Sequence, residues 1–110
     1  RVEMLVFIAP FIERQLVDEL VQENLEKFTS IQDLVSIIPF ISRETASQAA
    51  QLFTDQNLTI EDIMSIAPFV NRDIVDKMVI ACQYNIKNMH DIVPLAPFVS
   101  RDILQQILSR

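Results

Sequence analysis

One short phrase recurs four times along this chain at a constant interval of 29 residues. Each copy has two apolar residues, then proline and phenylalanine, and an arginine three positions after the phenylalanine. The recurring residues are Pro10, Phe11 and Arg14; Pro39, Phe40 and Arg43; Pro68, Phe69 and Arg72; and Pro97, Phe98 and Arg101. A fixed period of roughly 20–50 residues is typical of stacked supersecondary units, none of which buries its apolar face alone. The repeat therefore constrains the fold more than any other feature.

The first half of each repeat predicts a short helix. Ser30 and Asp33 have the spacing of a capping box, and the residue pairs at 59/62 and 88/91 have the same form. Apolar residues follow at helical spacing as far as the proline. Proline lacks a backbone donor and disfavours helical geometry at the residue before it. We expect a first helix of about eight or nine residues that ends or kinks at the proline.

The second half of each repeat predicts another helix, of about twelve residues, from the renewed 3.6-residue apolar period. Ser42, Asn71 and Ser100 stand at its cap position, where the first copy has the weaker Glu13. The chain contains no glycine to reverse it after this helix. Asn57 and the residue at 85 lie at those turns, and asparagine tolerates the left-handed conformation better than most residues.

These units predict an all-α fold, a right-handed α-α superhelix (solenoid) of about four 29-residue helix-turn-helix repeats. The repeats are about 1–29, 30–58, 59–87 and 88–110, in a single domain. No stretch alternates with the period of two that strands require. Because the chain opens on arginine and stops within an apolar periodic segment, we interpret it as a piece of a longer protein.

The layout resembles the broad class of two-helix α-solenoid repeats, which includes tetratricopeptide, HEAT and mitochondrial termination-factor repeats. The resemblance covers the whole chain in period and layout but not in signature. The tetratricopeptide pattern of Trp, Gly, Tyr and Ala is absent, and the HEAT period is longer. Solenoids expose a long surface built from the same columns of successive repeats, which suits extended partners.

Composition narrows the classes of partner. Half of the 110 residues are hydrophobic and 22% are charged, as in ordered globular chains. The net charge of −6 disfavours binding to nucleic acid and to anionic membrane surfaces. The longest apolar run, residues 5–12, is too short to span a membrane. The absence of glycine excludes Gly-rich phosphate loops.

The arginine column allows two interpretations. Four guanidinium groups in a ladder could bind carboxylates or phosphates along an extended ligand. Alternatively, each arginine could bond carbonyls left without partners at a helix end, or pair with a cap acid of a neighbouring repeat (Asp33, Asp62 or Asp91). We favour the structural interpretation and retain Arg14, Arg43, Arg72 and Arg101 as candidate binding residues.

The recurring proline and phenylalanine form the corner between the two helices of a repeat, and we interpret them as structural. The phenylalanines are expected to fill the space between successive repeats. His90 stands at the helix position of Glu3, Gln32 and Glu61, so we expect it to be exposed; Glu61 and His90 are further candidate binding residues. Cys82 is expected to be a packed thiol, and a single cysteine fits a reducing compartment such as the cytoplasm. No metal site, cofactor or catalytic residue is predicted from this set of residues.

The ends of the array carry apolar residues. Phe7 stands where two other repeats have serine, which indicates contact with further repeats, with a second copy of this chain or with a target. We expect a non-catalytic protein-interaction or scaffold module that presents an extended helical surface to a protein or peptide. The alternatives are an architectural element that self-assembles through its ends, giving a homo-oligomer, and a helical accessory domain of a larger enzyme.

Overall fold

The computed structural model describes residues 2–109, and throughout this range the protein is helical, with no strand. Its α-helices are α1 (Val2–Ile8), α2 (Arg14–Glu23), α3 (Ile31–Ile37), α4 (Arg43–Ala50), α5 (Ile60–Ile66), α6 (Arg72–Cys82) and α7 (Arg101–Leu108). Its 3₁₀ helices are η1 (Ala9–Phe11), η2 (Leu25–Lys27), η3 (Ile38–Phe40), η4 (Gln51–Phe53), η5 (Ala67–Phe69), η6 (Gln83–Asn85), η7 (Met89–Asp91) and η8 (Val93–Phe98). No helix in this range has the length and apolar character needed to cross a membrane.

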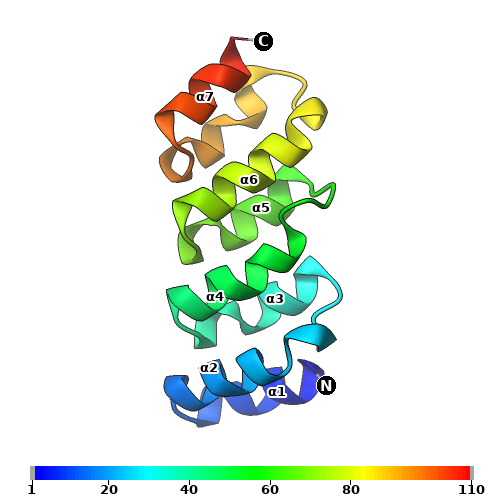
Figure 1. The fold of residues 1–110 in the computed structure, drawn as a ribbon, viewed down its shortest axis with the longest axis vertical. Coiled ribbons are helices and arrows are strands. Elements are labelled where there is room, and N and C mark those ends of the chain that lie inside the picture. The colour runs from blue at the N-terminus through cyan, green and yellow to red at the C-terminus, as the bar shows by residue number, and fades with distance from the viewer. Residues whose placement is uncertain (1, 110) are drawn as a thin grey trace.

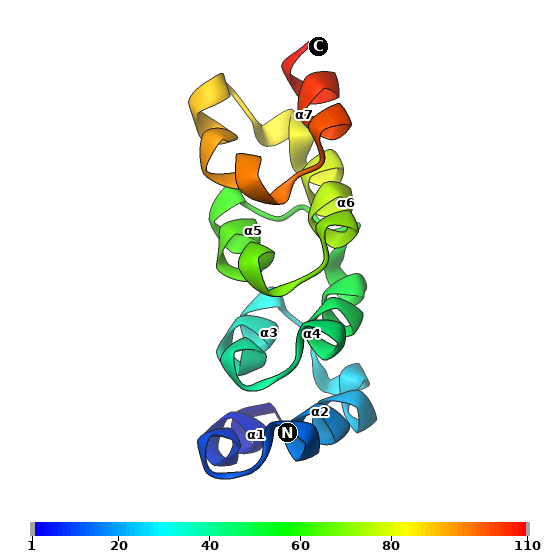
Figure 2. The ribbon, with the colours of Figure 1, turned by 90° about the vertical axis from the view of Figure 1, so that its left-hand side faces the viewer.

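The helices are arranged as pairs that follow one another along the long axis of the molecule, with the two ends of the chain at opposite ends (Figure 1). The molecule measures 45 × 21 × 18 Å. Turned by 90°, it shows α1, α3 and α5 in one column and α2, α4, α6 and α7 in the other (Figure 2). Consecutive members of a column touch: α1 contacts α3, and α3 contacts α5. Each sequence repeat therefore supplies one layer of the stack.

The recurring proline ends the first α-helix of each of the first three repeats, as the sequence predicts. Helices α1, α3 and α5 stop at isoleucine, and a 3₁₀ turn with proline at its second position follows. Proline is tolerated there because an N–H in the first turn of a helix has no intrahelical partner. The α-helical part has seven residues, fewer than expected. The second helices, of 8 to 11 residues, are also shorter than the predicted twelve.

The fourth repeat departs from the predicted pair of α-helices. Residues 89–98 form the two 3₁₀ helices η7 and η8 instead of one α-helix. Pro94 stands here where the second and third repeats have Ser36 and Ser65. An additional proline inside the helix removes one i→i−4 hydrogen bond and clashes with the carbonyl four residues earlier. The tighter 3₁₀ geometry accommodates it.

The predicted capping boxes are present at all three positions. The side chains of Asp33, Asp62 and Asp91 accept hydrogen bonds from the backbone N–H of the cap residue three positions earlier, at 3.2, 3.2 and 3.3 Å. At the second helix, the predicted side-chain cap is found for Ser42, whose hydroxyl accepts from the N–H of Thr45. It is not found at 71 or 100.

The prediction that Asn57 and Asn85 adopt the left-handed backbone conformation is wrong. No residue between 2 and 109 has a positive φ. The chain leaves α2, α4 and α6 through the 3₁₀ turns η2, η4 and η6, none of which requires the left-handed region. The amide of Asn85 instead donates to the side-chain oxygen of Asn57 at 2.6 Å, which links the equivalent turns of two repeats.

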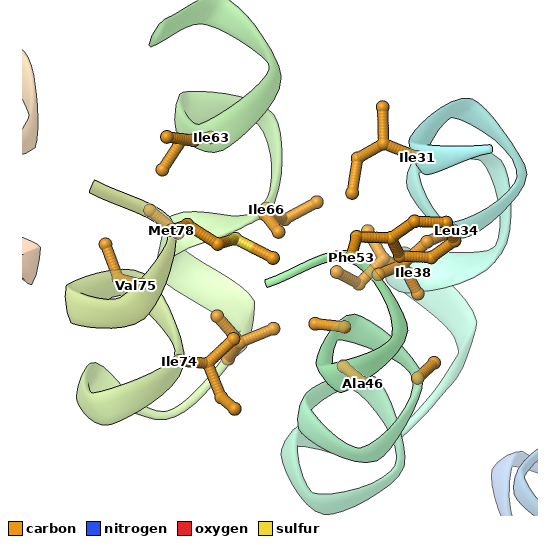
Figure 3. Close-up of a cluster of buried hydrophobic side chains, with 14 of the residues drawn as sticks. Ile31, Leu34, Ile38, Ala46, Phe53, Ile63, Ile66, Ile74, Val75 and Met78 are labelled. Carbon is orange, nitrogen blue, oxygen red and sulfur yellow. The ribbon is translucent and has the colours of Figure 1, made fainter. Parts of the chain in front are cut away.

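The core is continuous between layers. Figure 3 shows side chains from α3, η3, α4 and η4 facing side chains from α5 and α6. Phe53, Leu34 and Met78 are among its fully buried members. The corner phenylalanines were predicted to fill this space, but they lie at its edge. Phe40 and Phe98 are half-buried, whereas Phe69 is 42% exposed and Phe11 84% exposed. Phe40 and Phe98 pack against the core without being part of it.

Candidate functional site

The arginine column connects each layer to the next. The guanidinium of Arg14 donates to the backbone carbonyl of Ile41 at 2.7 Å, and that of Arg72 donates to the carbonyl of Val99 at 2.9 Å. Arg43 donates to the carbonyl of Val70 and, at 2.9 Å, to that of Pro68. In all three cases the main acceptor lies 27 residues ahead, just past the Pro-Phe corner of the next repeat. The acceptors are neutral carbonyls, not the cap acids.

A second set of hydrogen bonds joins the same layers. The N–H at the caps of α4, α6 and α7 donates to a side chain 24 residues earlier: Ser42 to Asp18 at 2.9 Å, Asn71 to Ser47 at 2.8 Å and Ser100 to Asp76 at 2.8 Å. These N–H groups are among the helix-terminal donors that have no intrahelical partner. The preceding repeat therefore satisfies the N–H of these cap residues.

Arg101 differs from the other three arginines. All four side chains are exposed, but the guanidinium of Arg101 has no hydrogen-bond partner among the described residues. Arg14, Arg43 and Arg72 differ from it in having a carbonyl acceptor within reach.

Two of the candidate binding residues lie at one pocket. It has a volume of about 460 Å³ and is open on the surface between α5 and the segment η7–η8. Glu61 and Met64 line it from α5, and His90 and Pro94 line it from the fourth repeat. The exposed His90 confirms the prediction of a solvent-facing histidine.

The polar character of this pocket is acidic. Among its lining residues, Glu61 and Asp91 are carboxylates and none is Lys or Arg. Asp91 is occupied, because it accepts from the N–H groups of Lys87 and Asn88. The Glu61 carboxylate has no hydrogen-bond partner within residues 2–109. It is therefore available to a ligand, next to the 41% exposed side chain of Met64.

The equivalent positions of the first two repeats line a similar pocket of about 410 Å³, with Glu3 at the position of Glu61 but Lys27 at the position of Asn85. The second and third repeats do not form this arrangement. Gln32 donates to the Asp62 side chain at 3.3 Å and so connects two layers. Ser36 and Ser65 donate to carbonyls of their own helices, those of Asp33 and Glu61. Met64 and Pro94 were not singled out from the sequence. The available signal was methionine where the other repeats have valine, and proline where two have serine.

The remaining candidates lie apart from this pocket. Cys82 is buried on α6, as predicted, and burial raises the pKa of its thiol. A thiol in that state is a poor nucleophile, because the thiolate is the reactive form. Across residues 2–109, no three His, Cys, Asp or Glu side chains are grouped so that they could hold a metal ion.

Comparisons with protein-family models, with curated proteins and with solved structures find no match to this chain. The functional argument therefore rests on the geometry described above.

Proposed function

We propose that this chain is an α-solenoid, a right-handed superhelix of about four two-helix repeats, and that it acts as a non-catalytic interaction module for a protein or peptide segment. The recurrence of the same hydrogen bonds at offsets of 27 and 24 residues supports the solenoid. In a solenoid each repeat contacts its neighbours in the same way, and the columns of successive repeats form one extended surface.

The pocket between α5 and η7–η8 is the observation that carries the binding proposal. It combines one available carboxylate, Glu61, with an exposed thioether, Met64, and an imidazole, His90. Methionine adapts its shape to varied apolar side chains. A carboxylate beside it favours a cation, and the net charge of −6 attracts basic segments over longer distances. The ligand that fits is a peptide with a Lys or Arg beside an apolar residue.

The test is selection from a random twelve-residue peptide library, followed by fluorescence anisotropy with the enriched peptides. We expect enrichment of a basic residue next to Leu or Met. Glu61→Gln should weaken binding of such a peptide roughly tenfold, which corresponds to ~1.4 kcal/mol. Glu19→Gln is the matched control, because Glu19 is an exposed acid on α2, far from the pocket.

Two outcomes would contradict the proposal. One is a library that yields no enriched sequence. The other is an equal loss of affinity in both glutamate variants, which would mean that the negative charge of the chain attracts the peptide without a specific binding site.

A further inference from the structure

We infer that the cationic group held in the pocket between α5 and η7–η8 is an arginine side chain of the bound peptide, which bridges two carboxylates, Glu61 and Asp91. The inference rests on the proposed function, because it concerns the peptide bound at the same pocket, and it adds a second acceptor and a choice between Arg and Lys. It starts from a comparison of the three places where the first helices of successive repeats meet. Each of these junctions has an aspartate at the same cap position.

The junction of α3 and α5 shows what this aspartate can bind. Asp62 accepts from the cap N–H of Thr59 through Oδ2 at 3.2 Å. Its other oxygen, Oδ1, accepts from the side-chain amide of Gln32 at 3.3 Å. A side chain at the position of Gln32 is therefore within reach of the aspartate of the next layer.

The junction of α1 and α3 has a cation of the chain itself. Glu3 and Asp33 line one pocket there, and Lys27 lines it with them. Asp33 again uses Oδ2 for the cap N–H groups of residues 29 and 30. At these two junctions the chain thus places an amide donor or a cation beside the cap aspartate.

The junction of α5 and η7 has neither. Glu61 stands at the position of Gln32, and an ionised carboxylate can only accept. Asn85 stands at the position of Lys27, and its amide donates to the side chain of Asn57 at 2.6 Å. The two side chains that could serve Asp91 by analogy therefore do not.

Asp91 keeps one oxygen for a ligand. The cap N–H groups of Lys87 and Asn88 both donate to Oδ2, and Oδ1 receives no hydrogen bond within residues 2–109. The ring of His90 also lines the pocket, but the hydrogen bond of this residue runs through its backbone N–H, to Asn88. Oδ1 of Asp91 and the carboxylate of Glu61 are thus two acceptors on one pocket of about 460 Å³.

An arginine of the peptide supplies what this junction lacks. The guanidinium is planar and carries five N–H donors in a fixed fork, so it can donate to two carboxylates at once. The ammonium of lysine is a compact, strongly hydrated charge without this paired geometry. The alkyl stem of arginine packs on apolar surface while its charged end stays polar, which suits the exposed thioether of Met64 beside Glu61.

The test is fluorescence anisotropy with three labelled peptides of the sequence Ala-Ser-X-Leu-Ser-Ala, in which X is arginine, lysine or citrulline, the uncharged analogue of arginine. We expect the arginine peptide to bind at least about tenfold more tightly than the lysine peptide, the effect of one additional hydrogen bond to a charged group. The citrulline peptide should not bind, because it lacks the positive charge.

Two substitutions, each with a matched control, locate the contact. Asp91→Asn keeps one oxygen for the cap N–H groups and replaces the free acceptor by a donor, so it should weaken binding of the arginine peptide about tenfold. Asp33→Asn makes the same change at the cap of α3 and should leave the affinity unchanged. Asn85→Lys brings the cation of the first junction into this pocket and should weaken binding by a similar factor. Gln15→Lys adds the same charge at an exposed position of α2 and should have no effect.

Circular dichroism establishes that the variants fold, and Asn85→Lys keeps the test decisive if Asp91→Asn does not. The inference is overturned by equal affinities for the arginine and lysine peptides, by an arginine peptide that does not bind, or by binding that survives either substitution. In each of these cases the library selection with Glu61→Gln still decides the proposed function by itself. A library without any enriched sequence would remove both the proposed function and this inference.

Discussion

At the scale of single residues, the arginines show how a charged side chain can stabilise a stack without an ionic partner. Arg14, Arg43 and Arg72 reach neutral carbonyls in the next repeat. These carbonyls lie in extended connectors, where no helix satisfies them. Hydrogen bonds from a charged donor contribute more than those between neutral groups. The arginine therefore satisfies a backbone group and joins two layers with one side chain.

We predict that Arg43→Ala lowers the free energy of unfolding by about 1.5–3 kcal/mol, because two carbonyls lose a charged donor. Arg101→Ala, at the equivalent position without an acceptor, should change it by less than ~0.5 kcal/mol. Denaturant titration at a protein concentration where the chain is monomeric measures both. Equal effects would mean that the guanidinium bonds contribute nothing to stability.

The phenylalanine side chains differ in burial, and we expect their contributions to stability to differ accordingly. Phe53 is buried on η4, whereas Phe11 is the most exposed of the corner residues. We predict that Phe53→Ala costs ~3–5 kcal/mol of stability, as is usual for a buried phenylalanine. Phe11→Ala should cost less than about 0.5 kcal/mol, because it removes no buried contact. Thermal unfolding of both variants checks this, and a large loss for Phe11→Ala would place that side chain in a core.

At the scale of elements, one proline decides between α and 3₁₀ geometry. The segment 88–98 keeps the cap of the earlier repeats and their apolar positions at 92 and 95, both buried. It nevertheless forms η7 and η8 and not a helix like α5. Pro94 is the residue that separates the two cases, because the lost hydrogen bond lies in the middle of the segment.

We predict that Pro94→Ser, which restores the residue of the second and third repeats, converts 89–95 to an α-helix and increases the far-ultraviolet helical signal. The reverse change, Ser65→Pro in α5, should reduce stability by ~3 kcal/mol. Circular dichroism and denaturant titration measure the pair. An unchanged spectrum for Pro94→Ser would mean that packing against α5 and α7, and not the proline, imposes the 3₁₀ form.

At the scale of the whole molecule, the stack is long and narrow, 45 × 21 × 18 Å, and each layer meets its neighbours through the same contacts. Such an architecture has interior layers covered on both sides and two ends covered on one. The interior layers bury apolar side chains such as Leu34, Ile63 and Met78 completely.

Much of the fold could be predicted from the sequence, because helix ends and helix faces depend on local rules. The 29-residue period, the aspartates of the capping boxes and the position of the prolines together indicate two short helices per repeat. Local rules also locate His90 on an exposed face and Cys82 on a buried one. Of the pocket, the sequence identified Glu61 and His90, since each stands at a variable position of the first helix.

The rest depended on distances between layers, which no local pattern contains. Tertiary structure decided that the arginines bond carbonyls 27 residues ahead, and that Asn71 and Ser100 turn their N–H groups to the preceding repeat. It also decided that Phe69 lies at the edge of the core and that Met64 completes the pocket. The sequence by itself determined the helices, since their hydrogen bonds join near neighbours; how the helices meet was decided by packing between residues a whole repeat apart.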